Sequence, residues 1–147
     1  MLIRSAAHAD LPAIVAMLAD DVLGADREAV VDDSYEWAFA DIHGDPRNHL
    51  VVGEEDGEVV AFLQVTYIPG LSRRGAERCQ VESVRVRSDC RGNGLGQELI
   101  AWVIERARER GCGLVQLTSD RSRVDAQRFY QRLGFVHSHV GFKLLLR

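Results

Sequence analysis

Three glycines in the stretch Arg91-Gly92-Asn93-Gly94-Leu95-Gly96 constrain this chain more than any other feature of its sequence. The stretch lies between an alternating strand pattern at Arg78–Val86 and a helical pattern of apolar residues at 94–111. A helix N-terminus presents unpaired N–H groups and the positive end of a dipole, and glycines let an anion approach those amides closely. Arg91 adds a guanidinium whose fork suits phosphate oxygens. The sequence therefore predicts a strand–loop–helix unit whose loop cradles a phosphate group.

Two common phosphate-binding motifs do not fit this loop. A Walker A motif needs a lysine after its last glycine, and Lys143 is the only lysine in the chain. The dinucleotide fingerprint needs the spacing GxGxxG, whereas the third glycine comes one residue early here. The acidic ribose contact that a nucleotide-binding α/β protein needs is also missing. A glycine turn that merely caps the helix remains the plain alternative.

The order of the other patterns predicts a single mixed α/β domain over residues 1–147. Strands are expected at 1–6, 49–54, 59–68, 78–86 and 114–118, and helices at 11–22, 34–43, 94–111 and 124–133. A hairpin joins the second and third strands at Asp56-Gly57. A final strand pair is expected at 135–139 and 142–146 around Gly141. The order βααβββαβαββ places helices over a central sheet.

Composition excludes several classes of protein. The net charge of −4 is too mild to indicate nucleic acid binding, and no apolar run is long enough to span a membrane. The polar start predicts no signal peptide. Three cysteines without CxxC spacing argue against a disulfide framework or a zinc site and favour the cytoplasm. Acidic residues dominate the first 70 positions and basic residues the rest, which indicates ligands of opposite sign or two solvated faces.

Two motifs resemble those of the GNAT N-acetyltransferase superfamily. Val84-Arg85-Val86 followed by 91–96 is similar to its acyl-CoA signature, Arg/Gln-x-x-Gly-x-Gly/Ala. The stretch Arg128-Phe129-Tyr130-Gln131-Arg132-Leu133-Gly134-Phe135 looks like the second family motif, at the expected distance. The resemblance covers nearly the whole chain, and the C-terminal part is also locally similar to aminoalkylphosphonate N-acetyltransferases. It implies a GNAT-like mixed sheet with two splayed parallel strands.

The resemblance implies acetyl-CoA as cosubstrate and no metal. In the family, the loop amides bind the CoA pyrophosphate, and the strand before the loop pairs its free backbone groups with the pantetheine arm, like an added strand. Carried onto this chain, the expected CoA-binding residues are Val84, Arg85, Val86, Arg91, Gly92, Asn93, Gly94, Leu95, Gly96, Asp125 and Arg128. Many members carry Asn at the position of Asp125, and helix capping by Asp120, Ser122 or Asp125 is an alternative role.

Tyr130 and Glu82 are the expected catalytic residues. Tyr130 resembles the family tyrosine beside the CoA sulfur, where it would protonate the departing thiolate; the alternative is a core aromatic like Phe129. Glu82 is the candidate base, because strand alternation puts it on the same face as Val84. A surface glutamate paired with an arginine is the alternative for Glu82.

The expected acceptor is a small-molecule or peptide amine. Acidic residues at 26–33, namely Asp26, Glu28, Asp32 and Asp33, could attract the amine cation. His137 and His139 would share one strand face in the other wall of the site, unless they are simply solvated. A monomer and a homodimer both remain open. The competing function is a non-catalytic acyl-CoA-binding or regulatory module on the same fold.

Overall fold

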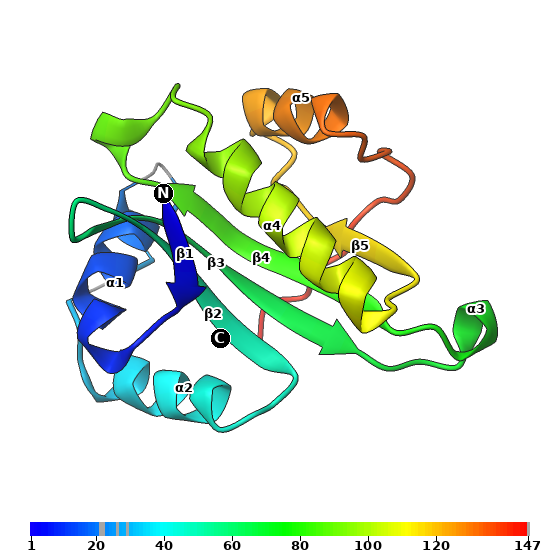
Figure 1. Ribbon diagram of the computed structural model, residues 1–147, viewed down its shortest axis with the longest axis horizontal. Coiled ribbons are helices and arrows are strands. Elements are labelled where there is room, and N and C mark those ends of the chain that lie inside the picture. The colour runs from blue at the N-terminus through cyan, green and yellow to red at the C-terminus, as the bar shows by residue number, and fades with distance from the viewer. Residues whose placement is uncertain (21–22, 26, 29, 147) are drawn as a thin grey trace.

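A five-stranded mixed sheet forms the centre of the computed structural model, which describes residues 1–20, 23–25, 27–28 and 30–146 (Figure 1). The strands are β1 (Leu2–Ser5), β2 (Asn48–Glu55), β3 (Glu58–Ile68), β4 (Arg78–Val86) and β5 (Leu114–Leu117). They follow one another across the sheet in sequence order. The first four are antiparallel neighbours, whereas β4 and β5 are parallel. The predicted mixed α/β fold is therefore confirmed.

Helices cover both faces of this sheet. α1 (Leu11–Ala19) and α2 (Asp33–His43) lie on one face, and α4 (Leu95–Arg110) and α5 (Val124–Arg132) lie on the other. The short α3 (Ser72–Gly75) lies in the connection between β3 and β4, beyond the ends of the strands (Figure 1). The sequence did not predict α3. Helix α1 is shorter than expected, and Val22 lies outside the described residues. Asp32 is the N-cap of α2 and accepts a hydrogen bond from the Ser34 amide, so the cap begins one residue earlier than the predicted Asp33-Ser34.

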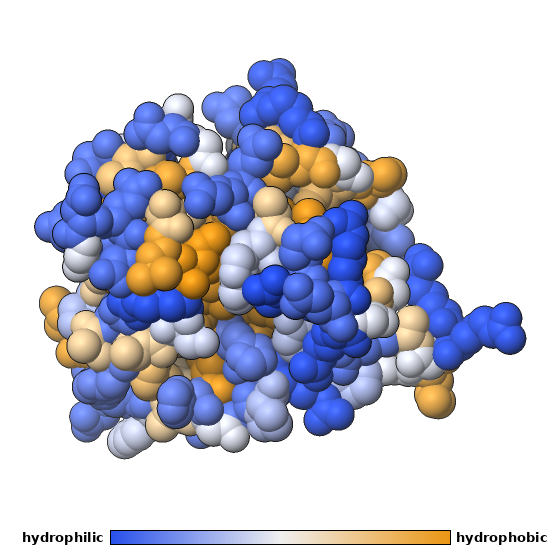
Figure 2. Space-filling view, viewed as in Figure 1, coloured by the Kyte–Doolittle hydropathy of each residue, from blue (hydrophilic) through white to orange (hydrophobic). Residues whose placement is uncertain are grey.

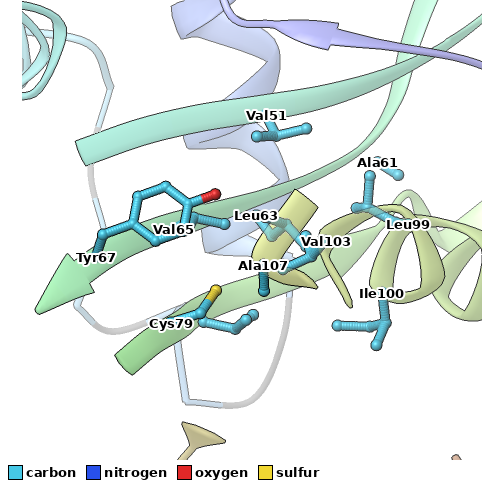
Figure 3. Packing of buried hydrophobic residues seen from close by; sticks show 11 residues of the cluster. Val51, Ala61, Leu63, Val65, Tyr67, Cys79, Leu99, Ile100, Val103 and Ala107 are labelled. Atoms are coloured by element: carbon cyan, nitrogen blue, oxygen red, sulfur yellow. The ribbon is translucent and has the colours of Figure 1, made fainter. Parts of the chain in front are cut away.

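The hydrophobic core is divided between the two faces. On one face, Leu99, Ile100, Val103 and Ala107 of α4 pack against side chains of β2, β3 and β4 (Figure 3). These are the positions that helical spacing predicts for the buried side of α4. On the other face, α1 and α2 pack over Val52 and Phe62. Figure 2 shows mostly hydrophilic side chains over the outer side of α4.

The β2–β3 hairpin has the turn that its sequence predicts. Asp56 and Gly57 have φ angles of 51° and 80°, the left-handed values that a two-residue hairpin of this type requires. Among the described residues, no helix combines the length and the hydropathy needed to cross a bilayer.

The predicted final strand pair is wrong for this structure. Neither 135–139 nor 142–146 forms a strand, and the described chain after α5 is an extended segment without a sheet partner. In Figure 1 this red segment passes behind the strands, on the side away from α4. The sequence pattern was that of strands, but a strand is only completed when its main-chain groups pair with a neighbour.

Candidate active site

β4 and β5 run together for only part of their length. Their parallel pairs extend from Arg78 and Leu114 to Val81 and Leu117. β5 ends there, whereas β4 continues to Val86. In the described part of the chain, the edge of β4 over residues 82–86 therefore has no strand partner on the β5 side. This is the expected separation of the two parallel strands, and it exposes main-chain groups to which an extended ligand can bind.

A bulge in β4 lies at the point of separation. The register with β3 shifts between Phe62 and Gln64, so that Ser83 and Val84 of β4 lie opposite a single residue of β3. Ser83 has a φ of 57°, a left-handed conformation that is strained for a residue other than glycine. Strain of this kind is concentrated at functional sites, and here it lies beside the open edge of β4.

The bulge corrects the predicted orientation of Glu82. Strict alternation would place Glu82 on the same face as Val84. Instead, Val84 packs with Val81 in the cluster under α4, and Glu82 pairs with Gln64 on the opposite face. The extra residue of the bulge resets the alternation. Glu82 is exposed, and its carboxylate forms no hydrogen bond or ion pair with the described residues, including the arginines considered as partners.

The glycine loop and the first turn of α4 form an open surface. Gly92 and Gly94 have φ angles of 83° and 78°. A Cβ placed on either residue would meet no atom of the described residues within 4 Å, so this part of the chain leaves the space in front of them open. Gly94 is the N-cap of the 16-residue helix, and no described side chain caps its first turn. The amides at the start of α4 are therefore available to an anion.

Arg91 ties this loop to two other elements. Its Nε donates a hydrogen bond to the Val86 carbonyl (3.1 Å), and its Nη2 donates to the Asp20 carbonyl (3.3 Å). The Asp20 carboxylate lies 3.9 Å from Nη2. Asn93 donates to the Cys90 carbonyl at 3.3 Å, within the loop. These bonds hold the loop between the end of β4 and the end of α1, while the Arg91 guanidinium stays half-exposed beside the loop amides.

Tyr130 extends from α5 into the hydrophobic cluster that also contains Val84 and Leu117, so it lies on the α4 side of the sheet. Its ring centroid is 5.1 Å from that of Phe129 and 5.8 Å from that of Phe135. Burial raises the pKa of the Tyr130 phenol above its usual value of 10, against the opposing effect of nearby arginine charges. Its hydroxyl forms no hydrogen bond with the described residues. The phenol is therefore protonated at neutral pH, and its hydroxyl can donate to a ligand.

Phe129 connects α5 to the glycine loop. A Cβ placed on Gly96 would lie 3.4 Å from Phe129 Cζ and 3.7 Å from a methyl group of Val86. Gly96 therefore allows close packing, and Phe129 has the structural role that the sequence assigned to it.

Two predicted CoA contacts lie at the periphery. Asp125 and Arg128 are exposed on α5 and form an ion pair with each other at 3.9 Å. The expected capping of α5 is wrong: its N-cap is Arg123 without a side-chain bond, and Asp120 instead accepts hydrogen bonds from Ser122 in the preceding turn. Asp125 lies in the first turn, where a negative charge favours the helix dipole.

Some of the residues predicted to attract the acceptor amine are already bonded to other groups of the chain. Asp32 caps α2, and Glu28 is paired with Arg27 at 3.3 Å. Asp26 lies outside the described residues. His137 and His139 are exposed in the C-terminal segment and do not share a strand face, because no strand forms there.

Comparison with known proteins identifies the family. Residues 15–135 match the model of the acetyltransferase (GNAT) family. The chain belongs to the GNAT family. This GNAT protein is 32% identical over 98 residues to the aminoalkylphosphonate N-acetyltransferase of Salmonella typhimurium. The matched residues make up 67% of this chain and only 63% of that relative. It is 33% identical over 139 residues to the L-methionine sulfoximine/L-methionine sulfone acetyltransferase of Pseudomonas aeruginosa, 90% of this chain and 78% of that one.

A solved structure of a transcriptional regulator from Bacillus halodurans is 48% identical to this GNAT protein, with a TM-score of 0.96 and 99% of each chain covered. Both curated relatives are named as acetyltransferases, and the family is the one that the two sequence motifs predict. Sequence reasoning missed the bulge at Ser83 and the charge of Arg123 near Tyr130. A serine in a valine-rich strand gave no signal for the bulge.

Proposed function

We propose that this GNAT protein transfers an acetyl group from acetyl-CoA to the primary amine of a small molecule. One arrangement carries the proposal: the open edge of β4 leads to the uncapped start of α4, with the protonated Tyr130 phenol on the same side of the sheet. An ammonium must lose a proton before it can attack, and a departing thiolate benefits from gaining one. Glu82, the proposed base, and Tyr130, the proposed acid, lie on opposite faces of the sheet at β4, and each can serve one of these two proton transfers.

The residues present fit acetyl-CoA. The open space at Gly92 and Gly94 leaves room for a diphosphate against the loop amides, beside the cation of Arg91. β4 has no strand partner on the β5 side beyond Val81 among the described residues, so main-chain groups around Val84 and Val86 would pair with the pantetheine arm. Two carbonyls of this edge already accept side-chain hydrogen bonds, that of Val84 from Arg85 Nη1 (3.0 Å) and that of Val86 from Arg91 Nε (3.1 Å). Leu95 and Gly96 contribute first-turn amides, and the exposed Asp125 and Arg128 remain candidates for a contact with the coenzyme's outer part. When bound, the cosubstrate supplies an activated acetyl thioester.

Each catalytic residue has one proposed task. Glu82, exposed beside the bulge, accepts a proton from the incoming amine directly or through water. Tyr130 holds a proton for the departing sulfur, and its raised pKa keeps that proton in place throughout the neutral range. A backbone N–H near Val84 would stabilise the developing negative charge on oxygen. The proposed chemistry uses no metal.

The proposed acceptor class follows the curated relatives and the charge of the chain. The two relatives are named for small amine substrates, an aminoalkylphosphonate and methionine sulfoximine or sulfone. The acidic N-terminal half would attract an amine cation, and the basic C-terminal half would attract the coenzyme phosphates. A thiol-release assay on a panel of amines, including aminophosphonates and polyamines, tests the proposal. We expect release of free CoA with at least one amine, and binding without release on the whole panel would contradict acetyl transfer.

The placement of the coenzyme has its own test with a matched control. Gly94→Trp fills the space in front of the loop, so we expect it to abolish acetyl-CoA binding in calorimetry. Gly57→Trp adds the same side chain in the β2–β3 hairpin, where the φ of 80° and the open surroundings are equivalent. The control therefore carries the same backbone strain and should bind acetyl-CoA as the unmodified chain does. Equal affinities for the two variants would place the coenzyme elsewhere.

A second function is favoured by one comparison. The 48% identical structure is named a transcriptional regulator, which is compatible with a regulatory module that binds acyl-CoA without catalysis. Such a module would bind acetyl-CoA, lose that binding on Gly94→Trp, and release no thiol with any amine. The thiol-release panel thus separates the two functions.

The three free cysteines support the additional proposal of a reducing compartment such as the cytoplasm.

A further inference from the structure

Three side chains of β4 follow one another along the face of the sheet that is turned away from α4. Cys79 and Val81 are buried in the hydrophobic cluster under α4. Alternation along the strand therefore directs Arg78, Gln80 and Glu82 to the opposite face, which lies behind β4 in Figure 1. Arg78 and Gln80 are partly exposed, and Glu82 is exposed. These three residues, which we call the polar track, present a cation, a neutral amide and a carboxylate in that order.

The two charged ends of the polar track are not used by the rest of the described chain. Arg78 forms no hydrogen bond or ion pair with the described residues, and the same is true of Glu82. The acidic neighbour of Arg78, Glu77, is bonded instead to Arg110, whose Nε donates to its carboxylate at 2.5 Å. A guanidinium and a carboxylate in this state can each bind an opposite charge on a ligand.

The middle of the polar track belongs to a row of neutral polar side chains that crosses four strands. Asn48, Thr66, Gln80 and Gln116 are successive partners in the registers of β2, β3, β4 and β5. The Thr66 hydroxyl donates to Asn48 Oδ1 at 2.6 Å, and Gln116 Nε2 donates to Gln80 Oε1 at 2.7 Å. Gln80 Nε2 and Gln116 Oε1 have no further partner among the described residues. This pair of side chains therefore offers one donor and one acceptor side by side, which matches an amide group of a ligand.

The length of the polar track limits the size of the ligand that can contact both ends. Arg78 and Glu82 are four strand residues apart, so their Cα atoms are separated by about 13 Å at roughly 3.3 Å per residue. Three or four extended peptide residues cover a similar length at about 3.4 Å each. A single amino acid is too short to reach from one end to the other.

We propose that the acceptor is an elongated zwitterion with a primary amine at one end, an anionic group at the other and amide groups between them, as in a peptide of three or four residues. Arg78 binds the anionic group, Gln80 and Gln116 bind the amides, and the amine lies at Glu82. The amine end rests on the proposed acetyl transfer, whereas binding at Arg78 does not. In the transfer, the bond from the amine nitrogen to the acetyl carbon forms as the carbon–sulfur bond breaks. One amine proton passes to Glu82, and the sulfur takes one from Tyr130.

A series of glycine peptides tests the length of the acceptor in the thiol-release assay. We expect kcat/KM to be about tenfold or more higher for triglycine or tetraglycine than for glycine, the scale of one hydrogen bond to a charged group. Triglycine amide, which lacks the carboxylate, and 8-aminooctanoate, which lacks the internal amides, should both be poorer acceptors than triglycine. Highest kcat/KM for glycine or for 8-aminooctanoate would overturn the proposal.

Substitution of Arg78 tests the anionic end. Arg78→Gln should raise the KM for triglycine by about tenfold or more, without changing kcat or the KM for acetyl-CoA. It should have no effect on triglycine amide, and Arg78→Lys should restore most of the affinity for triglycine. Arg74→Gln is the matched control, because Arg74 is an exposed arginine of α3 outside the polar track, and it should behave as the unmodified chain does. An equal response of triglycine and triglycine amide to Arg78→Gln would overturn the proposal.

Calorimetry of triglycine with the CoA-loaded protein separates this proposal from the proposed transfer. Binding that depends on Arg78, without thiol release, would support the ligand class and contradict acetyl transfer. Thiol release that depends neither on peptide length nor on Arg78 would overturn the ligand class and leave the transfer intact. If triglycine neither binds nor releases thiol while another amine does, the ligand class alone is wrong, and if no amine releases thiol either, both proposals are wrong.

Discussion

Replacing Tyr130 by phenylalanine isolates the proposed proton donor from the packing of the same ring. The substitution removes one oxygen and leaves the ring, which lies 5.1 Å and 5.8 Å from its two aromatic neighbours. The hydroxyl forms no hydrogen bond with the described part of the chain, so no protein group loses a partner. We expect the free energy of unfolding to change by less than about 1 kcal/mol, the scale of one net hydrogen bond.

Tyr130→Phe should affect kcat far more than it affects the free energy of unfolding. Positioned proton transfer contributes on the order of 10²–10⁴ in rate, which corresponds to about 3–5 kcal/mol of activation free energy. Because the proposed coenzyme site consists of the loop and the β4 edge, we expect acetyl-CoA affinity not to change. The signature is therefore a loss in kcat of about a hundredfold or more, with the dissociation constant and melting temperature retained.

Steady-state thiol release, acetyl-CoA calorimetry and thermal unfolding measure these three quantities. The pH dependence adds a check. Burial raises the folded-state pKa of Tyr130, so an unfolded chain loses this proton first as pH rises through about 10, and folding stability falls there. The phenylalanine variant has no phenol to titrate at position 130, so its stability should not fall near this pH for that reason. If kcat of the variant stays within twofold of the original at neutral pH, Tyr130 is a packing residue and another group protonates the sulfur.

Two further substitutions test the remaining parts. Glu82→Gln should lower the rate of thiol release by about a hundredfold at neutral pH, and the deficit should shrink above the pKa of the amine, where no base is needed. An undiminished rate for that variant would remove Glu82 from the mechanism. Asp10→Asn should lower the free energy of unfolding by about 1–3 kcal/mol, measured in urea at neutral pH. The Asp10 carboxylate accepts two hydrogen bonds from the Arg4 guanidinium (2.7 Å and 3.0 Å) and one from the Ala7 amide (2.7 Å). The Arg4 side chain is one-third exposed, and solvent therefore screens part of this interaction. The hydrogen bonds from Arg4 lower the pKa of the Asp10 carboxyl in the folded chain. The stabilisation by Asp10 is therefore complete above about pH 4 and is lost as the pH falls through that lowered pKa. If Asp10→Asn destabilised the protein equally at pH 3 and at neutral pH, the pairing with Arg4 would be contradicted.

The sequence predicted the elements that local signals determine. The hairpin at Asp56-Gly57, the buried side of α4 and the loop at 91–96 each depend on residues close together in the chain. Glycine positions with left-handed φ and helical spacing of apolar residues carry this information by themselves. The same signals located the expected coenzyme loop.

The orientation of Glu82 could not be predicted in this way. It depends on one extra residue in β4, and nothing in the residue types around Ser83 distinguishes a bulge from a regular strand. The final strand pair failed for a different reason. Apolar alternation at 135–146 reports that the segment favours a strand, but strand formation requires a neighbour that this chain does not provide among its described residues.

The contact between Gly96 and Phe129 restricts how this protein can vary over evolution. A Cβ at position 96 would touch the Phe129 ring at 3.4 Å, so a side chain that extends beyond Cβ toward the ring would compete with it for the same volume. A residue larger than alanine at 96 should be tolerated only together with a smaller one at 129. Aligned relatives should therefore show an inverse correlation in side-chain volume between these two positions.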